Sequence, residues 1–246
     1  MKGMYQIILF DLDGTLLPLD IDVFIRKYFE AVTPFFKDLV EPELFFKNLI
    51  SSTEKMIKNP GDFTNEEVFM KSFLPAVGRD RETIYPHFNR FYEHEFPKLK
   101  QFAGYSEWSA KIVGLLVEKG YSIVLATNPV FPLRATEERM AWAGVGQFPW
   151  SLVTTYENCS GCKPSIHYYR GICERLGVIP EDCLMIGNDV QEDLVAGTIG
   201  MDTFLVTDYL IDRGEPNYNA HYRGTLEELF GFVKGLPYRE KVLKKG

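Results

Sequence analysis

Residues 7–15 read IILFDLDGT, an apolar run that ends in two carboxylates, a glycine and a threonine. The apolar run is typical of a buried β-strand, and the residues after it are typical of a strand-to-loop corner. Asp11 and Asp13 are two residues apart, so in an extended segment both side chains leave on the same side. Two carboxylates at such a short distance repel each other unless a cation or a shared proton lies between them. The corner therefore predicts a metal-assisted site in which one carboxylate is available as a nucleophile.

The composition of the whole chain indicates the class of protein. Its 246 residues are 46% hydrophobic and 25% charged, as in soluble globular proteins with an ample core. The net charge of -7 argues against a nucleic-acid partner, which usually requires a basic face. No apolar run reaches the roughly 18 residues of a membrane span, and the N-terminus has no signal-peptide pattern. We therefore expect no membrane association and a cytoplasmic location.

The chain has 4 cysteines, and two of them, Cys159 and Cys162, form a C-x-x-C pattern. Without a second Cys or His pair this is a weak signal for zinc. Functional disulfides are rare in cytosolic proteins, so an ordinary loop is the favoured interpretation, and a redox-active pair is the alternative.

Residues 20–100 contain no pattern of a buried strand and are predicted to be helical. The expected helices cover residues 20–31, 41–58, 65–74 and 81–96, and Asp20 and Thr64 are the expected N-caps. Aromatic residues recur in these helices at helical spacing. This pattern predicts a packed helical bundle.

Strands and helices alternate in the rest of the chain. Strands are expected at residues 121–126, 151–154, 183–186 and 203–206, and helices at 107–119, 133–143, 166–176, 187–200 and 226–233. This alternation predicts an α/β fold with a parallel sheet and right-handed crossovers. We therefore expect an α/β core of residues 1–16 and 101–246, with an all-helical domain of residues 17–100 inserted in it.

Ligands of parallel sheets bind at the carboxyl ends of the strands, and polar residues follow several of the expected strands. Thr127 and Asn128 could donate hydrogen bonds to phosphate oxygens beside a helix N-terminus, or they could be ordinary capping residues. Lys163 could neutralise a phosphate or hold a carboxylate, although most lysines are simply solvated. Taken singly, these residues do not identify a site.

The segment after the strand at 183–186 is acidic. A helix that begins at Gly187 would place Asp189 and Asp193 on one face. Hard oxygen ligands of this kind suit Mg²⁺. The alternative is that Asn188 or Asp189 only caps the helix.

The order of these motifs along the chain resembles that of the haloacid dehalogenase superfamily. The motifs are Asp-x-Asp-Gly-Thr at 11–15, Thr-Asn at 127–128, Lys-Pro at 163–164 and Gly-Asn-Asp at 187–189 with Asp193. The resemblance covers the whole α/β part of the chain and implies a Rossmann-like three-layer core with a parallel sheet. The inserted helices resemble the C1-type cap of that family.

The resemblance implies a role for each matching residue. Asp11 would attack phosphorus and form an aspartyl-phosphate. Asp13 would act as general acid and then as base, and its backbone carbonyl would bind Mg²⁺. Thr127 and Asn128 would bind phosphoryl oxygens, and Lys163 would stabilise the negative charge around Asp11 and the phosphate.

The fourth motif departs from the common form of the family, which has an aspartate where this chain has Asn188. Either Asp189 or the amide oxygen of Asn188 would complete the Mg²⁺ shell, with Asp193 in support. A neutral ligand would lower the affinity for Mg²⁺, since this affinity depends on the charge of the ligands.

These motifs predict a Mg²⁺-dependent phosphatase that hydrolyses a small phosphorylated metabolite. Asp13 favours phosphoryl chemistry over carbon–halogen cleavage, because the dehalogenases of the family look as if they lack this second aspartate. A phosphomutase or other phosphotransferase with the same core, and a non-catalytic binding protein, are the alternatives. Among the residues of the cap, Phe24, Arg26, Lys27 and Lys47 could reach the substrate.

Overall fold

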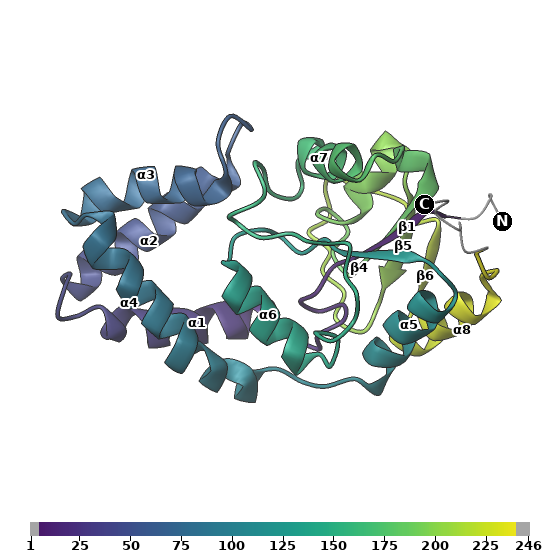
Figure 1. The fold of residues 1–246 in the computed structure, drawn as a ribbon, viewed down its shortest axis with the longest axis horizontal. Helices are drawn as coiled ribbons and strands as arrows, with labels where there is room; N and C mark the ends of the chain where they lie inside the picture. Colours follow the sequence, from purple (N-terminus) through teal and green to yellow (C-terminus); the bar gives the residue numbers. More distant parts are fainter. Residues whose placement is uncertain (1–4, 240–246) are drawn as a thin grey trace, which may run out of the picture.

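The computed structural model describes residues 5–239 and contains a six-stranded sheet in which all strands are parallel (Figure 1). The strands lie in the order β3-β2-β1-β4-β5-β6. Their bounds are β1 Ile7–Phe10, β2 Ser122–Leu125, β3 Leu152–Val153, β4 Cys183–Gly187, β5 Asp202–Val206 and β6 Tyr222–Gly224. The predicted α/β fold with a parallel sheet is confirmed.

Strand β1 lies in the middle of the sheet, between β2 and β4. Its last residue, Phe10, is level with Leu125 of β2 and Ile186 of β4. The backbone pairing continues past the strand end, since the Asp11 N–H donates to the Ile186 carbonyl at 2.8 Å. The segments that follow these three strands therefore begin side by side at one edge of the sheet, as the parallel register requires.

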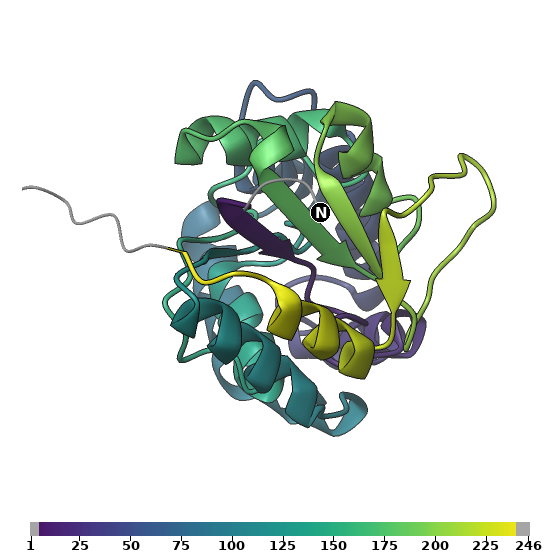
Figure 2. The same ribbon diagram turned by 90° about the vertical axis from the view of Figure 1, so that its right-hand side faces the viewer.

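Helices cover both faces of the sheet (Figure 2). One face packs against α5, Glu107–Glu118, and α8, Leu226–Gly235; the other packs against α7, Ile166–Leu176, and the 3₁₀ helix η3, Leu194–Ile199. The side chains of β1 alternate between the two faces, with Ile8 and Phe10 in one core and Ile7 and Leu9 in the other. Burial on both faces explains why this strand is apolar at every position.

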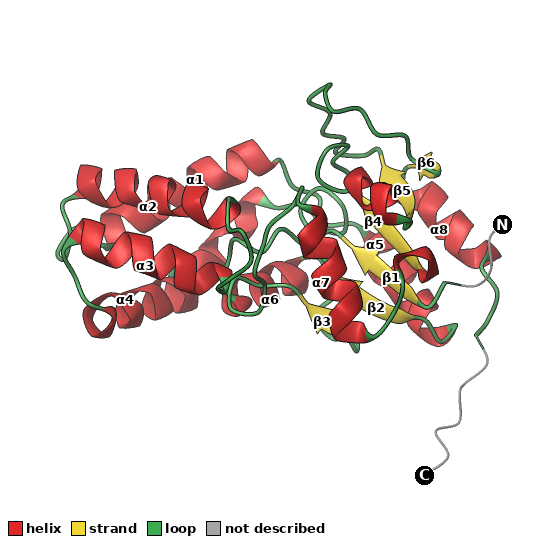
Figure 3. Ribbon diagram, turned by 90° about the horizontal axis from the view of Figure 1, so that it is seen from above, coloured by secondary structure: helices red, strands yellow, loops and turns green. Residues whose placement is uncertain are grey.

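The segment between β1 and α5 forms a group of helices that lies to one side of the sheet (Figures 1 and 3). These helices are α1 Ile21–Phe35, α2 Pro42–Ile57, α3 Asn65–Val77 and α4 Arg81–His94, followed by the 3₁₀ helix η1, Phe96–Phe102. We call α1 to α4 the helical cap. The remaining elements are α6, Leu133–Trp142, and the 3₁₀ helix η2, Pro180–Asp182.

The predicted N-caps of the helical cap are confirmed. The Asp20 carboxylate accepts a hydrogen bond from the Val23 N–H at 3.0 Å at the start of α1. Thr64 and Glu67 form a reciprocal capping box at the start of α3. These bonds satisfy backbone donors that no turn of the helix can satisfy.

One expectation about the sheet region was wrong, and one strand was not predicted. Residues 187–200 do not form one helix: the strand β4 extends to Gly187, turns follow it, and the regular part is only the short η3. The Asp189 carboxylate accepts from the N–H groups of Gln191 and Glu192, and such side-chain bonds compete with helical ones. The edge strand β6 was not predicted, because its three residues carry no apolar run.

No helix in residues 5–239 is long and apolar enough to cross a membrane. The first residues of the chain, which bear on the expected absence of a signal peptide, lie outside the described residues.

Candidate active site

The loop after β1 is a tight turn built around Gly14. Its backbone has a φ of 81°, and its N–H donates to the Leu17 carbonyl at 2.8 Å. A Cβ atom at this position would also collide with the side-chain amide of Asn188. Glycine is therefore required both by the backbone conformation and by the close approach of the loop after β4.

The carboxylate of Asp11 is held by a buried lysine. The Lys163 Nζ lies 2.8 Å from Asp11 Oδ1 and 2.7 Å from Asp193 Oδ1, and the side chains of Lys163 and Asp193 are each 1% exposed. The other oxygen of Asp11 accepts a long hydrogen bond of 3.3 Å from the Thr15 hydroxyl. The structure thus brings Asp11, Lys163 and Asp193 together from segments that lie far apart in the sequence.

Burial and charge act in opposite directions on these groups. Burial raises the pKa of Asp11 above its ordinary value, although the charge of Lys163 opposes the shift. Burial likewise raises the pKa of Asp193 to about 6 against the influence of Lys163. Burial alone would lower the pKa of Lys163, but the carboxylates of Asp11 and Asp193 hold it well above the ordinary value. Lys163 is therefore a permanent positive charge at the base of the site.

Asp193 takes its position because Gly187 has no side chain. A Cβ atom on Gly187 would collide with the carboxyl group of Asp193. The second oxygen of Asp193 accepts from the Asp189 N–H at 3.0 Å. The Asp193 carboxylate therefore connects the end of β4 to Lys163.

Asp13 is paired with Arg139, which the sequence did not identify. Arg139 Nη1 donates to Asp13 Oδ2, and the Arg139 guanidinium lies 4.6 Å from the centre of the Phe131 ring. Asp13 Oδ1 is buried and has no hydrogen-bond partner among the described residues. Burial raises the pKa of Asp13, and Arg139 opposes this effect. No local pattern distinguishes Arg139 in the sequence, because only the fold brings α6 to the loop after β1.

Thr127 and Asn128 lie at the end of β2 and line the same pocket as Asp11 and Asp13. The side-chain amide of Asn128 donates to Glu192 Oε2 at 3.1 Å, and its Oδ1 atom is buried without a partner in the described chain. Burial raises the pKa of Glu192 to about 7. Glu192 is a second residue of the pocket that the sequence analysis did not identify.

The fourth motif differs from the expected arrangement. Asn188 Oδ1 accepts from the Thr15 hydroxyl at 2.9 Å, so this residue closes the turn of the first motif. Asp189 is bound through both oxygens by Arg213, at 2.8 and 2.7 Å. Asp193 instead faces Lys163, so the expectation that Asp189 and Asp193 present two carboxylates on one helical face was wrong. The absence of a helix at this position is the reason.

The predicted residues line one pocket with about 660 Å³ of empty space, part of it open to solvent. Its lining includes Asp11, Asp13, Thr127, Asn128, Asn188, Asp189, Glu192 and Asp193 with Arg139 and Arg213. Lys163 is not part of the lining, but it forms ion pairs with two residues that are, Asp11 and Asp193. The structure therefore brings together all the site residues that the sequence predicted.

The oxygen atoms of this pocket fit Mg²⁺ in their chemistry. The Asp11 carboxylate lines the pocket and its Oδ2 accepts a long hydrogen bond of 3.3 Å from Thr15, and hard oxygens such as this are the ligands that Mg²⁺ prefers. No group of three or more His, Cys, Asp or Glu side chains is arranged as a metal site within residues 5–239. Arg213, which is bound to Asp189, has a side chain that is 52% exposed.

The cysteines of the C-x-x-C pattern are both free. Burial raises the pKa of each thiol, Cys159 and Cys162, to about 12, which is opposite to the shift of reactive cysteines. Cys162 Sγ accepts a hydrogen bond from the side-chain amide of Asn65 at 3.3 Å. These contacts agree with the favoured interpretation of an ordinary loop.

The residues of the cap that line the pocket are Ile21 and Ile25. Phe24 is fully buried, and Arg26 and Lys47 are exposed. Lys27 pairs with Glu30 at 2.7 Å. None of the residues proposed from the sequence, Phe24, Arg26, Lys27 or Lys47, lines the pocket. In α1 the helical turn directs the isoleucines toward the pocket and the other three side chains away from it.

Comparison with known proteins gives a family and a fold. Residues 5–198 match the family model of haloacid dehalogenase-like hydrolases. No curated protein matches the chain. Among solved structures, a HAD phosphatase from Thermococcus onnurineus is 20% identical, with a TM-score of 0.59, and the match covers 95% of this chain and 100% of that one.

Two further structures show how widely this fold is used. An L-2-haloacid dehalogenase from Xanthobacter autotrophicus is 13% identical with a TM-score of 0.57, over 95% of this chain and 100% of that one. A HAD hydrolase from Bacillus subtilis, bound to magnesium, is 18% identical with a TM-score of 0.53, over 94% and 99%. At these identities the likeness establishes the fold, and the reaction has to be argued from the site.

Proposed function

This chain belongs to the family of haloacid dehalogenase-like hydrolases, and on that basis we propose that it is a Mg²⁺-dependent phosphatase of a small phosphorylated metabolite. The observation that carries the proposal is that Asp11 and Asp13 line one pocket and that the buried Lys163 is paired with Asp11. A dehalogenase needs no second carboxylate at this position. A phosphatase needs one to move a proton to the leaving group and from water.

In the first half of the reaction, the Asp11 carboxylate attacks phosphorus and an aspartyl-phosphate forms. The bond between phosphorus and the alcohol oxygen breaks, and Asp13 donates its proton to that oxygen. Burial raises the pKa of Asp13, which supports its role as an acid, and the unpartnered Oδ1 is the atom that holds the proton. Arg139 orients Asp13 by holding its other oxygen.

In the second half, water attacks the aspartyl-phosphate. Asp13 accepts the proton of the water, inorganic phosphate leaves, and the Asp11 carboxylate is restored. Lys163 stabilises the negative charge on Asp11 and the phosphoryl group in both halves, and Thr127 and Asn128 bind phosphoryl oxygens.

A bound Mg²⁺ would neutralise charge on the phosphoryl oxygens. Its ligands would be the Asp11 carboxylate, the Asp13 backbone carbonyl and either Asn188 or Asp189. The Asp189 carboxylate would have to be released from its ion pair with the half-exposed side chain of Arg213 before it could bind a metal.

The test is release of inorganic phosphate from an aryl phosphate with and without Mg²⁺. Asp11→Asn should lower kcat by at least about 10³-fold while circular dichroism stays unchanged, because an amide is a poor nucleophile. Asp38→Asn, on the exposed end of the cap, is the matched control and should keep full activity. Full turnover by Asp11→Asn would show that another group attacks phosphorus.

Product analysis separates hydrolysis from the transfer alternative. With a hexose phosphate as substrate, a phosphatase releases phosphate and free sugar, whereas a mutase forms an isomer of the sugar phosphate. Formation of the isomer would contradict the proposal.

A further inference from the structure

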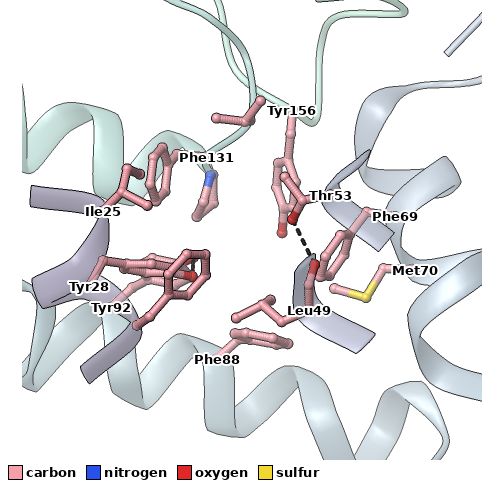
Figure 4. A pocket seen from close by; sticks show the side chains of 13 residues that line it. Ile25, Tyr28, Leu49, Thr53, Phe69, Met70, Phe88, Tyr92, Phe131 and Tyr156 are labelled. Carbon is pink, nitrogen blue, oxygen red and sulfur yellow. Dashed lines mark hydrogen bonds between the residues drawn. The ribbon is translucent and has the colours of Figure 1, made fainter. Parts of the chain in front are cut away.

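A second pocket lies beside the catalytic one, between the helical cap and the loop that follows β2 (Figure 4). It holds about 580 Å³ of empty space, part of it open to solvent. We call it the apolar cap pocket. Its main lining residues are Leu49, Phe69, Met70, Phe88, Phe131 and Tyr156.

The apolar cap pocket adjoins the catalytic pocket. Ile25, Val130 and Phe131 line both of them. Figure 4 shows Ile25 and Phe131 on one side of the apolar cap pocket, with Phe69 and Met70 across from them. A molecule whose phosphate lies at Asp11 would pass these shared side chains to reach the space under the cap.

The lining of the apolar cap pocket carries no Lys, Arg, His, Asp or Glu among the described residues. Its hydroxyl groups already have partners: Tyr28 and Tyr92 are paired at 3.0 Å, Thr53 donates to the Leu49 carbonyl at 2.8 Å, and the Tyr156 hydroxyl is hydrogen-bonded to Tyr85 outside the lining. Burial raises the pKa of Tyr28 to about 12, so this hydroxyl stays neutral. The pocket offers no partner for a second charged group of a substrate and few for a sugar.

We propose that the apolar cap pocket binds the alcohol part of the substrate, and that this part is an uncharged apolar group, aromatic or aliphatic. The inference rests on the proposed phosphatase activity and adds the class of leaving group to it. It disfavours sugar phosphates, bisphosphates and phosphorylated carboxylic acids, because each of these would bury polar or charged groups without partners.

A series of n-alkyl phosphates, from methyl to octyl phosphate, tests this inference. The leaving alcohols of the longer members have nearly the same chemistry, so differences in kcat/KM report on binding of the chain. We expect kcat/KM to rise by about 3- to 4-fold per methylene until the pocket is full. Hexyl phosphate should also exceed glucose 6-phosphate and glycerol phosphate by more than about 10-fold. A flat or falling series, or a preference for the sugar phosphate, would overturn the inference.

A charge placed in the pocket gives an independent measurement. Thr53→Glu should lower the ratio of kcat/KM for octyl phosphate over methyl phosphate by at least about 10-fold, since it buries a carboxylate beside the alkyl chain. Ser51→Glu places the same charge on the same helix outside the pocket lining and should keep the wild-type ratio. An unchanged ratio in Thr53→Glu would place the alkyl chain elsewhere.

The same assays distinguish failure of the inference from failure of the proposed function. If all esters were hydrolysed at rates that did not depend on chain length, the protein would be a phosphatase, but the apolar cap pocket would not bind its leaving group. No phosphate release from any ester in the presence of Mg²⁺ would contradict the phosphatase activity, and the inference would fall with it.

Discussion

Asp13 experiences two opposing influences, and their balance decides whether it can act as an acid. Burial raises its pKa, while the guanidinium of Arg139 stabilises the charged form. Arg139 is 1% exposed and also donates to the Ala135 carbonyl of its own helix at 3.2 Å. Its position is therefore set by the helix and not by Asp13 alone. Arg139 therefore orients the proposed acid Asp13, but its positive charge also lowers the pKa of that carboxyl group.

Gly187→Ala tests the connection between β4 and Lys163. The new Cβ atom would push away the carboxyl group of Asp193, which would leave Lys163 with Asp11 as its only carboxylate partner. We expect the free energy of unfolding to fall by about 1–3 kcal/mol, as in overpacked cores, and kcat to fall by about 10-fold. Urea titration and the phosphate-release assay measure the two effects.

Gly231→Ala is the matched control for this substitution. Gly231 lies in α8, and a Cβ atom there would meet nothing within 4 Å. The control should be as stable as the wild type or slightly more stable, because alanine favours the helix over glycine by about 0.5–1 kcal/mol. If Gly187→Ala behaved like this control, the position of Asp193 would not depend on Gly187.

Glu192 predicts a dependence of stability on pH. Burial raises its pKa from the ordinary 4.5 to about 7, so its contribution to stability is fully present below pH 4.5 and is lost as pH rises through about 7. Glu192→Gln carries no charge at any pH. We expect it to be more stable than the wild type by about 1–2 kcal/mol at pH 8, after allowance for solvent screening, and this advantage to disappear below pH 5.

Urea titrations of both proteins in EDTA, from pH 4.5 to 8, measure this difference. Glu54→Gln removes an exposed glutamate from α2 and serves as the control. A stability difference between Glu192→Gln and wild type that did not change with pH would mean that Glu192 is charged throughout this range.

At the level of elements, α3 is connected through Asn65 to two loops of the candidate site. The fully buried side-chain amide of Asn65 donates to the carbonyls of Pro129 and Gly161, each at 3.1 Å. The first of these follows Thr127 and Asn128, and the second precedes Lys163. One side chain of the helical cap thus holds both segments that contact the phosphate in the proposed mechanism.

Asn65→Leu should therefore affect stability and turnover together. The carbonyls of Pro129 and Gly161 would lose their buried hydrogen-bond donor, so we expect the free energy of unfolding to fall by about 2–4 kcal/mol. The loops that carry Thr127 and Lys163 would also lose the side chain that holds them together. We therefore expect a decrease in kcat that is larger than any change in KM. Asn48→Leu removes a half-buried amide that donates to the Leu44 carbonyl of its own helix, far from both loops, and should leave kcat unchanged with a loss of stability of about 1 kcal/mol or less. Equal behaviour of the two variants would assign Asn65 no role in positioning the loops.

For the whole molecule, the helical cap and the α/β part share one hydrophobic core. Phe24 of α1 is fully buried, and its ring centre lies 6.0 Å from Phe96, 6.5 Å from Phe131 and 6.2 Å from Trp142. Phe10 and Leu12 belong to the same cluster of buried side chains. A core that is continuous in this way favours unfolding of the cap and the α/β part in one step.

Calorimetry should therefore find a single unfolding transition for this protein. Phe24→Ala should lower the free energy of unfolding by about 3–5 kcal/mol while the transition stays single. Phe63→Ala, in a loop of the cap where the residue is 50% exposed, should cost about 1 kcal/mol or less. Two separate transitions in the wild type would show that the cap unfolds independently of the core.

Several features of the protein were predictable from the sequence because they depend on local chemistry. The apolar run at 7–10 specified a strand buried on both faces, and the alternation of strands and helices specified a parallel sheet. In such a sheet the strand ends lie at one edge, so Asp11, Thr127 and Asn188 had to approach each other. Asp20 and Thr64 were recognisable as caps because capping involves only residues near in sequence.

Other features were decided only by the tertiary structure, because they join segments distant in sequence. Arg139 reaches Asp13 across 126 positions, and Arg213 reaches Asp189 from the loop after β5. The helix expected after Gly187 does not form, because side chains of that segment bind backbone groups and distant partners instead. The apolar cap pocket likewise arises only where the helical cap meets the loop after β2. Periodicity specifies which face of an element is buried, and packing decides which charges and cavities meet there.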